Sequence, residues 1–366
     1  MTLHHLPLIE CVNRPDALAL GAKWDDLQQS SSATGPFTTW AWTRAWLETE
    51  GADADLQVMT ARDPDSGHLI GIAPFHVADA RRGGIPVREL RLLGSGIAAP
   101  DHLDLIVHRD APPDVAEALW AAVESARRWH LINLDGIAAG GHLARVALRS
   151  QDNEPVPLPC PYLPLDGGWE VVVARFSGAL RKNLERYGRK LDRDADVVER
   201  LIANPEDLDE TFDHLIHLHQ SIRTAKGDPG LFAHPGMQRF LRAAAHRFLE
   251  AGRLRMWRLD ADGTPIAVIW CVRSGDSIAF YTTGYDTAWS NYGPGRRIMA
   301  RAIKGAVDEG VTEFDFLRGD EPYKRQWGTE TRYDLVIKRP TGSRGHLLSI
   351  GSAVIRLSRR ALRRAA

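Results

Sequence analysis

The sequence has few cysteines and no long apolar run. Its 366 residues include only three cysteines, which are widely spaced and form no Cys-x-x-Cys pair. This usage fits a reducing compartment and argues against a disulfide framework or a structural zinc site. No window approaches the roughly 18 consecutive apolar residues that a membrane-spanning helix needs, and the first residues lack a signal peptide's basic and apolar regions. We therefore expect a soluble, cytoplasmic protein.

The sequence also lacks an excess of either charge. Its formal net charge is −1, with 46 lysines and arginines against 47 aspartates and glutamates. Because no overall field draws such a chain to phosphate backbones, we expect no nucleic-acid partner. The hydrophobic content of 44% is ordinary for a globular protein, and the length allows two domains.

Several enzyme motifs are missing. The chain has no Gly-x-Ser-x-Gly, which argues against a serine hydrolase, and no Gly-Lys-Ser/Thr triplet, which excludes a nucleoside triphosphate loop. His214, His217 and His219 are spaced i, i+3 and i+5. They do not share the i, i+4 face that a helical zinc pair needs, so we expect no metal.

The sequence does contain a strand, a glycine-bearing loop, a helix and a strand between residues 277 and 317. Pro294 suits the first helical position, where its missing N–H costs nothing, and glycines on either side let a ligand approach the backbone. Such a helix start favours phosphate, and two arginines there oppose the helix dipole unless an anion is bound. The candidate cofactor-binding residues are Asn291, Tyr292, Gly293, Gly295, Arg296 and Arg297.

The helix after this loop carries an apolar stripe from Ile298 to Val307 with helical period. The strand predicted at Thr312–Leu317 alternates, which places Asp315 opposite Phe314 and Phe316. Together these segments predict a cofactor-binding βαβ unit. The sixth loop position is Ile298 rather than glycine, so the dinucleotide fingerprint is not met.

The segments around this loop resemble a known family. Gly284-Tyr-Asp286, Gly293-Pro-Gly295 and the run from Phe314 to Gly328 are similar to the C-terminal half of GNAT-superfamily acyltransferases. The most similar branch is that of the cellulose-biosynthesis (CelD/BcsL-like) acetyltransferases, which is related to the Fem aminoacyl transferases. The likeness covers residues 159–331, about half of the chain. Further similar segments are Cys160–Pro164, Arg181–Arg186, Leu218–His219, Arg223 and Gly227.

This resemblance implies an acyl-CoA site. In that superfamily the fourth and fifth strands splay apart around the pantetheine arm, and the pyrophosphate rests on the loop that is here Asn291–Arg297. The usual glycine pattern of that loop is replaced by Tyr-Gly-Pro-Gly. The implied activity is transfer of an acyl group, in the first instance acetyl, to a sugar or amino acceptor in extracellular polysaccharide or cellulose biosynthesis.

Acyl transfer needs a base for the acceptor and an acid for the leaving thiolate. Tyr323 is a candidate acid, since a phenol pKa of about 10 lies above a thiol pKa of about 8.5. It follows the last βαβ strand, where that superfamily often places such a tyrosine; packing is the alternative. Asp315 is a candidate base or else a buried partner of Arg318 or Lys324. His219 is a further candidate base or substrate contact.

Polar and aromatic residues near these positions are candidates for acceptor binding. Trp327 either stacks on a sugar ring or belongs to the core, and Lys324 either binds an anion or pairs with nearby acids. A basic stripe on the helix from Ser177 is either solvated or binds an anionic substrate; it comprises Lys182, Arg186, Lys190 and Arg193. The candidate substrate-binding residues are Arg223, Arg318, Asp320, Lys324 and Trp327.

We predict an α/β fold of the α+β type, with two GNAT-like domains in tandem, each a mixed sheet flanked by helices. Residues 1–150 form a degenerate first domain, since no glycine loop opens a helix there. Residues 151–165 read as a proline-rich linker and 166–340 as the acyl-CoA-binding domain. Residues 341–366 form a basic amphipathic tail suited to docking on an anionic membrane or a synthase.

Two other functions stay open. A non-catalytic accessory protein of polysaccharide synthesis would keep the fold and dock on the inner membrane face through the tail. A Fem-like transferase would use aminoacyl-tRNA instead of acyl-CoA. The near-neutral charge argues against the second, because tRNA contacts are dominated by phosphates.

Overall fold

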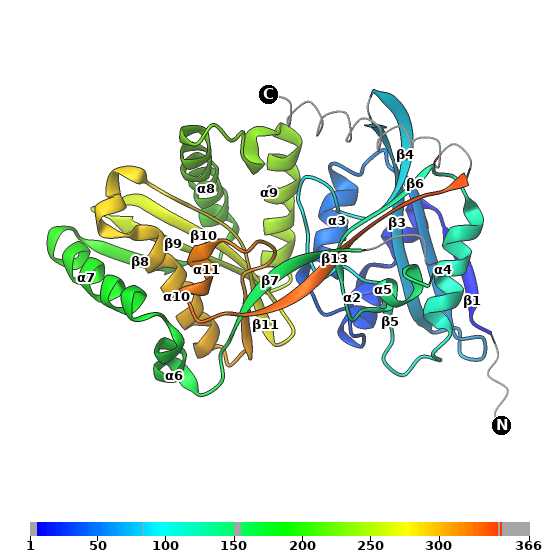
Figure 1. Ribbon diagram of the computed structural model, residues 1–366, viewed down its shortest axis with the longest axis horizontal. Helices are drawn as coiled ribbons and strands as arrows, with labels where there is room; N and C mark the ends of the chain where they lie inside the picture. Colours follow the sequence, from blue (N-terminus) through cyan, green and yellow to red (C-terminus); the bar gives the residue numbers. More distant parts are fainter. Residues whose placement is uncertain (1–5, 83, 150–154, 343–344, 346–366) are drawn as a thin grey trace, which may run out of the picture. The chain divides into compact units, whose positions relative to one another are not determined.

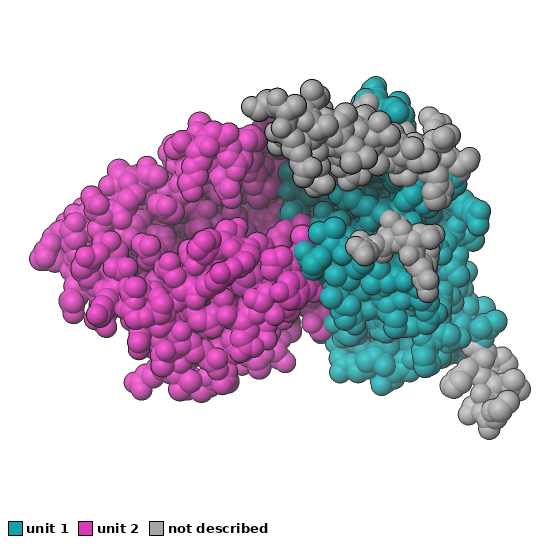
Figure 2. Space-filling view, in the orientation of Figure 1, with its two compact units in different colours: residues 1–33, 51–157, 334–366 teal, residues 34–50, 158–333 magenta. Residues whose placement is uncertain are grey.

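The computed structural model describes residues 6–82, 84–149, 155–342 and 345, and it divides the chain into two compact units (Figure 2). Unit 1 comprises residues 1–33, 51–157 and 334–366, and unit 2 comprises residues 34–50 and 158–333. No helix in the described residues combines the length and apolar character needed to cross a membrane. The predicted basic tail falls almost wholly outside the described residues.

Unit 1 contains a mixed sheet with the strand order β1-β2-β3-β4-β6-β13, and a short strand β5 beside β3 (Figure 1). Its strands are β1 (Leu8–Val12), β2 (Asp55–Arg62), β3 (Leu69–Arg82), β4 (Ile85–Leu92), β5 (Ile106–Val107), β6 (Leu131–Ala138) and β13 (Glu330–Pro340). Its helices are α1 (Arg14–Ala19), α2 (Gly21–Gln29), α4 (Val115–Ala126) and α5 (His142–Ala147).

Unit 2 contains a second mixed sheet, with the order β7-β12-β11-β10-β9-β8. Its strands are β7 (Val156–Pro164), β8 (Val197–Leu201), β9 (Leu254–Ala261), β10 (Thr264–Ser274), β11 (Ser277–Tyr285) and β12 (Glu313–Asp315). Its helices are α3 (Trp40–Glu48), α6 (Gly168–Arg175), α7 (Gly178–Asp194), α8 (Pro205–Ala225), α9 (Pro235–Glu250), α10 (Pro294–Asp308) and α11 (Pro322–Arg325). Three short 3₁₀ turns are η1 (Pro36–Thr38), η2 (Leu231–Ala233) and η3 (Thr287–Tyr292).

The two units repeat one topology. In unit 1, β4 runs through α4 to β6 and pairs with it in parallel, as β11 runs through α10 to β12 in unit 2. β7, which follows α5 of unit 1, pairs with β12 of the unit 2 sheet. β13, which follows α11 of unit 2, pairs with β6 of the unit 1 sheet. The predicted fold of mixed sheets flanked by helices is confirmed.

The division of the chain differs from the predicted one in two places. Residues 34–50 belong to unit 2, because Trp42 on α3 is fully buried and meets Phe240 of α9 edge to face at 4.7 Å. Helical periodicity shows that α3 has an apolar face but not which surface covers it. The proline-rich segment predicted as a linker contains β7, and its residues Tyr162–Pro164 pair with β12.

Helices cover both faces of the unit 2 sheet. Ile269 and Cys271 on β10 belong to the core formed with α6, α7 and α10, whereas Trp270 between them packs on Phe212 of α8. Because successive strand residues point to opposite faces, α10 and α8 lie on opposite sides of the sheet. The predicted apolar stripe of α10 is buried in this core, and Cys271 is fully buried in it.

Candidate functional site

The two parallel strands β11 and β12 diverge soon after they begin to pair. Ser277–Ala279 pairs with Glu313–Asp315, and β11 then continues alone on that side to Tyr285. A bulge leaves Tyr281 as an extra residue in β11, since Trp270 is opposite Thr282 and Cys271 is opposite Phe280. The edge of β11 beyond Ala279 therefore offers backbone N–H and C=O groups that no neighbouring strand takes up.

A polar turn ends β12 and causes this divergence. Leu317 has a left-handed backbone (φ 54°), and its N–H donates to the Asp315 carboxylate at 2.7 Å. Gly319 follows with φ 107°, which a side-chain-bearing residue rarely adopts. The strand predicted over Thr312–Leu317 is therefore too long, because alternation of apolar residues continues into the turn.

The loop after β11 leads into the N-terminus of α10. Gly293 is the N-cap residue with a left-handed backbone (φ 60°), and it provides no side-chain cap. The N–H of Gly295 has no acceptor among the described residues. A Cβ added at Gly295 would lie 2.9 Å from Cδ1 of Tyr285. Both glycines therefore permit close packing, and in the described part of the chain the Gly295 N–H is left without an acceptor at the positive end of the helix dipole.

The two arginines at this helix start have different surroundings. Arg297 pairs with Asp192 of α7 and, at 2.6 Å, with Glu199 of β8. Its burial alone would lower the pKa of Arg297, but these hydrogen bonds raise that pKa above the ordinary value. Arg297 therefore anchors α10, whereas the exposed Arg296 forms no ion pair with any described residue.

The other two predicted loop residues lie in η3. Asn291 is exposed, and half-buried Tyr292 lies beside Trp289, with 5.2 Å between ring centroids. The Tyr292 hydroxyl is 3.2 Å from Oδ2 of Asp194, and Nζ of Lys190 lies 4.2 Å from the centre of its ring. The start of α10 is thus bordered by aromatic rings and by α7.

His219 packs on the opposite face of β11. A Cβ added at Gly284 would lie 2.5 Å from the backbone nitrogen of His219, so α8 directly contacts this strand. Burial lowers the pKa of His219 below its ordinary value, although a hydrogen bond that His219 donates to Gln220 opposes this shift. The Nδ1 atom lies 3.2 Å from Oε1 of Gln220. With the amide in that orientation, Nδ1 carries the proton and Nε2 is the basic atom.

Arg223 connects His219 with Tyr323 electrostatically. Its positive charge lowers the pKa of both groups, so both lie within its reach. The pKa of Tyr323 is nevertheless raised, mainly because neighbouring atoms desolvate the hydroxyl although 42% of the side chain is exposed, and also because of Glu321. A neutral histidine and a protonated tyrosine therefore both lie within the electrostatic reach of Arg223.

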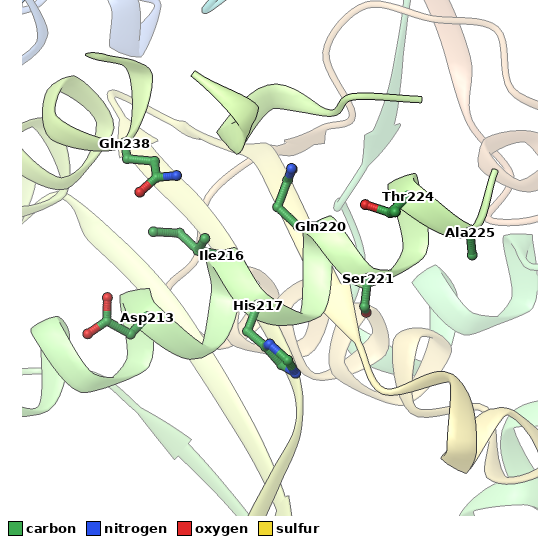
Figure 3. Close-up of a pocket in the computed structure, with 8 residues that line it drawn as sticks. All are labelled: Asp213, Ile216, His217, Gln220, Ser221, Thr224, Ala225 and Gln238. Carbon is green, nitrogen blue, oxygen red and sulfur yellow. The ribbon is translucent and has the colours of Figure 1, made fainter. Parts of the chain in front are cut away.

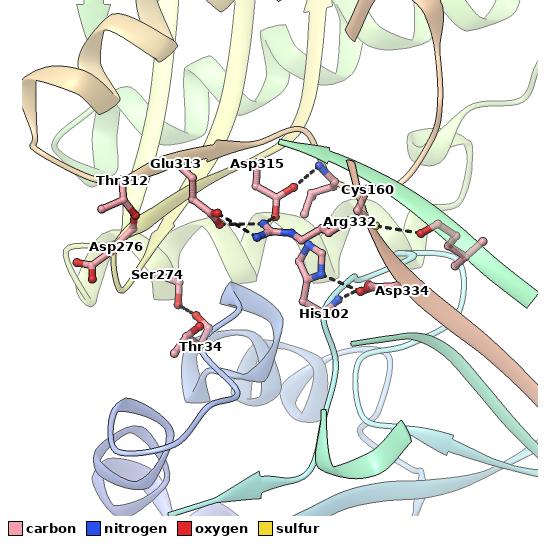
Figure 4. A network of polar contacts seen from close by, with 12 residues as sticks. Thr34, His102, Cys160, Ser274, Asp276, Thr312, Glu313, Asp315, Arg332 and Asp334 are labelled. Carbon is pink, nitrogen blue, oxygen red and sulfur yellow. Dashed lines mark hydrogen bonds and ion pairs between the residues drawn. The ribbon is translucent and has the colours of Figure 1, made fainter. Parts of the chain in front are cut away.

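Asp315, the other predicted base, is held in an ion pair. Its carboxylate is almost fully buried and pairs with Arg332, which also binds Glu313 at 2.8 Å (Figure 4). Arg332 was not among the predicted partners of Asp315, which were Arg318 and Lys324. The ion pair and the Leu317 N–H occupy the carboxylate, which makes Asp315 a positioning residue for the turn.

Three predicted substrate-binding residues have structural roles. Lys324 is buried and donates to the carbonyls of Leu317, Arg318 and Gly319, and it also pairs with Glu321 at 3.0 Å. This ammonium group closes the turn after β12 and is not offered to a ligand.

Asp320 is paired with Arg325 at the surface. Trp327 is 3% exposed and meets Phe176 edge to face at 5.0 Å, so it belongs to the core rather than to a sugar platform. Of the predicted substrate contacts, Arg223 is half-exposed next to the candidate acid and base, with Asp228 at 2.9 Å. Arg318 is half-buried in the turn.

A hollow of about 660 Å³ lies on the outer face of α8 and contains none of the predicted catalytic residues (Figure 3). Gln220, which contacts His219, is one of the residues that line this hollow. Its lining residues are Asp213, Ile216, His217, Gln220, Ser221, Thr224, Ala225 and Gln238.

Sequence reasoning missed two residues that hold candidate site groups. Gln220 fixes the tautomer of His219, and its position next to that histidine was the available signal. Arg332 holds Asp315, and nothing local in the sequence indicated it because β13 was not predicted.

Comparison with known proteins agrees with this geometry. Residues 178–325 match the family described as "Acetyltransferase (GNAT) domain". The prediction of a GNAT-type acyltransferase is confirmed for this part of the chain, and the family generally uses acyl-CoA. The search of curated proteins found no match to this sequence.

Solved structures are similar over most of the chain. FemX is 11% identical with a TM-score of 0.58, covering 90% of this chain and 96% of that chain. A conserved protein of unknown function from Bacteroides thetaiotaomicron is 13% identical with a TM-score of 0.55, covering 92% and 100%. L-PGS from Bacillus licheniformis is 11% identical with a TM-score of 0.54, covering 92% and 96%. At these identities the likeness supports the fold alone.

Proposed function

We propose that the chain transfers an acyl group, acetyl in the first instance, from acyl-CoA to a sugar or amino acceptor. The observation that carries this proposal is the unpaired edge of β11, which ends at the uncapped N-terminus of α10. The pantetheine arm of CoA has two amide groups, which can pair with a strand edge as a peptide does. Its pyrophosphate suits a helix N-terminus.

The loop residues fit this ligand. The Gly295 N–H and the exposed Arg296 side chain are the groups that would hold the pyrophosphate, because neither has a partner among the described residues. When bound, acyl-CoA supplies a thioester whose acyl carbon is open to attack. Arg297 takes no direct part, since Asp192 and Glu199 already neutralise its charge.

His219 acts as the general base in this proposal. Its lowered pKa keeps the ring neutral near pH 7, and the Gln220 contact leaves Nε2 able to accept a proton from the acceptor's hydroxyl or amine. Tyr323 retains its proton because its pKa is raised, and it donates that proton to the departing sulfur. Arg223 lies near both groups and provides positive charge for an anionic part of the acceptor.

Turnover of acetyl-CoA with panels of amino sugars, glycans and amines tests this function, with release of free CoA thiol as the readout. We expect release that depends on an acceptor and is lost in His219→Ala. Failure of the intact chain to bind CoA would exclude the proposal. Binding without turnover of any acyl-CoA would instead support a non-catalytic accessory protein.

The resemblance of Phe314–Trp327 to cellulose-biosynthesis acetyltransferases supports an acceptor from extracellular polysaccharide synthesis. Competition of glycan fragments and nucleotide sugars for turnover would identify it. Preference for a free amino acid or polyamine over every glycan would contradict this part of the proposal.

A second candidate is aminoacyl transfer, which the similarity to FemX favours. Such an enzyme would take its aminoacyl group from tRNA and would not need CoA. Transfer of a radiolabelled amino acid from charged tRNA, with no effect of added acetyl-CoA, would support this candidate over acyl-CoA-dependent transfer.

A further inference from the structure

A cluster of cations on α7 lies next to the candidate pyrophosphate loop. The Tyr187 ring packs on Gly293, since a Cβ added there would lie 3.0 Å from Cδ2 of the ring. The guanidinium carbon of Arg186 lies 4.6 Å from the centre of that same ring. Nζ of Lys190 in turn lies over the ring of Tyr292, the residue that precedes Gly293. Arg186 and Lys190 are thus both held against rings that border the loop.

These two cations are not neutralised within the described residues. Arg186 donates to the uncharged Asn183 side chain at 3.2 Å, and neither Arg186 nor Lys190 forms an ion pair with a carboxylate. The carboxylates closest in sequence to Lys190 have other partners, although the charge of Lys190 helps to lower the pKa of Asp194 without a direct ion pair. Asp192 pairs with Arg297, and Asp194 pairs with Arg193 and accepts from the Tyr292 hydroxyl.

The cluster therefore combines unpaired positive charge with aromatic surface. Arg296 adds a third cation without an ion pair at the start of α10, and Trp289 lies beside Tyr292. Aromatic rings stack on nucleotide bases, and fixed ammonium and guanidinium groups bind phosphates. A single pyrophosphate at the helix N-terminus does not account for Arg186 and Lys190, which belong to a different helix.

We propose that Arg186 and Lys190 bind the 3′-phosphate of the CoA nucleotide, so that the protein discriminates CoA from 3′-dephospho-CoA. This inference rests on the proposed acyl-CoA function. A phosphate monoester carries about −1.5 to −2 charge near pH 7. This charge matches the two positive charges of Arg186 and Lys190 beside the loop. The 3′-phosphate is the one charged group of CoA outside the pyrophosphate, so it is the group left for them.

Calorimetric titration of the full chain with CoA and with 3′-dephospho-CoA tests this inference. We expect the wild type to bind CoA about tenfold more tightly, as one charge-assisted contact contributes. In Arg186→Gln/Lys190→Gln the two ligands should bind equally. The ratio of the affinities for CoA and 3′-dephospho-CoA can be measured on the wild type alone, so this part of the test does not depend on the folding of a variant. Lys190→Gln alone should lower that ratio partially.

Arg181→Gln/Arg189→Gln is the matched control. It removes the same charge from the same helix at exposed positions, and Arg181 lies on the opposite side of α7 from Lys190, about two and a half turns away. This control should keep the tenfold preference. Loss of the preference there would mean that α7 acts through its general field, which would overturn the assignment.

The outcomes separate this inference from the function on which it rests. Wild type that binds both ligands equally well would overturn the role of Arg186 and Lys190 and leave acyl-CoA binding intact. Wild type that binds neither ligand would overturn the proposed function and this inference with it. Equal weakening of both ligands in Arg186→Gln/Lys190→Gln would place these cations on the pyrophosphate instead.

Discussion

The two units share one topology but differ at the point where the central strand passes into a helix. In unit 2, residues 286–293 connect β11 to α10 and leave the helix start without a side-chain cap. In unit 1, the longer segment 93–114 connects β4 to α4 and includes β5. Asp104 in that segment is buried and accepts the N–H groups of His142 and Leu143. Among the described residues, the same fold thus leaves the Gly295 N–H without an acceptor at the start of α10, whereas in unit 1 a longer stretch of chain fills the corresponding connection.

The charged residues in the first turns of α4 and α10 also differ. The first turn of α4 contains Glu117, which pairs with Arg145 and Arg149, and hydrogen bonding to Arg145 lowers the pKa of this carboxyl. The first turn of α10 contains Arg296 and Arg297 and no acid. Of these charges, only that of Arg296 has no ion pair among the described residues, so the start of α10 is the one with a cation available to a phosphate. This difference supports placing the proposed acyl-CoA site in unit 2.

His219→Ala should have the largest effect on turnover if the chemistry belongs to unit 2. Loss of a general base lowers kcat by about 10²–10⁴-fold, while CoA affinity should stay unchanged. Because burial lowers the pKa of His219, wild-type kcat should fall on the acid side at a lower pH than it would for an ordinary histidine, as the ring becomes protonated. A stopped-flow assay of thiol release between pH 5 and 9 measures both the loss of kcat in His219→Ala and the pH dependence of the wild-type kcat.

His217→Ala is the control, since His217 lies on the outer face of the same helix. Equal losses in the two variants would show that α8 is only a structural element.

Asp315→Ala should act on stability rather than on chemistry. Removing one partner of a buried ion pair lowers the free energy of unfolding by about 3–5 kcal/mol. We expect the lower end of this range, because Arg332 would still be paired with Glu313. Urea denaturation of Asp315→Ala and Asp320→Ala provides the measurement, because the Asp320–Arg325 pair is exposed to solvent and its loss should hardly change the free energy of unfolding. Normal stability with lost turnover in Asp315→Ala would instead make Asp315 the general base.

Tyr323→Phe should reduce kcat by about 10²-fold through loss of the acid that protonates sulfur. The defect should be smaller for acyl donors with more acidic thiol leaving groups, which need less proton transfer. Tyr333→Phe, at another exposed tyrosine of unit 2, is the control. A defect that is independent of the leaving group would return Tyr323 to a packing role.

Glu117→Gln in unit 1 should have the smallest effect. The ion pairs of Glu117 are near the surface, so their loss should lower the free energy of unfolding by about 1 kcal/mol or less. The lowered pKa means that this contribution is present above the unfolded pKa and is lost as pH falls through the folded pKa. CoA affinity should be unchanged, as calorimetry can verify; a gain would show that α4 also receives phosphate.

Local pattern predicted much of the fold. The strand, loop and helix between residues 277 and 308 and the helix that begins after Ser177 were predicted close to their observed bounds, because they depend on neighbours in sequence. The exchange of β7 and β13 between the sheets was not predicted, since pairing partners are set by long-range contacts.

The same limit applies to the candidate site. The loop at Gly293–Gly295 and the candidates His219 and Tyr323 were found because glycine, proline and titratable residues stand out locally. For Lys324 and Trp327 the sequence left a structural role and a ligand contact both open, because polar or aromatic character does not reveal which atoms surround a side chain. The pairing of Asp315 with Arg332 depends on β13, which lies beyond the turn.

The most direct test of the account is calorimetric titration of CoA into wild type, Gly295→Ala and Gly295→Asp. Both substitutions add a Cβ that crowds Tyr285, but only the aspartate adds negative charge at the start of α10. We expect micromolar binding to wild type, weaker binding to Gly295→Ala and none to Gly295→Asp. Equal affinity of the two variants for CoA would contradict the placement of the pyrophosphate at α10, and absence of binding to wild type would contradict the acyl-CoA function itself.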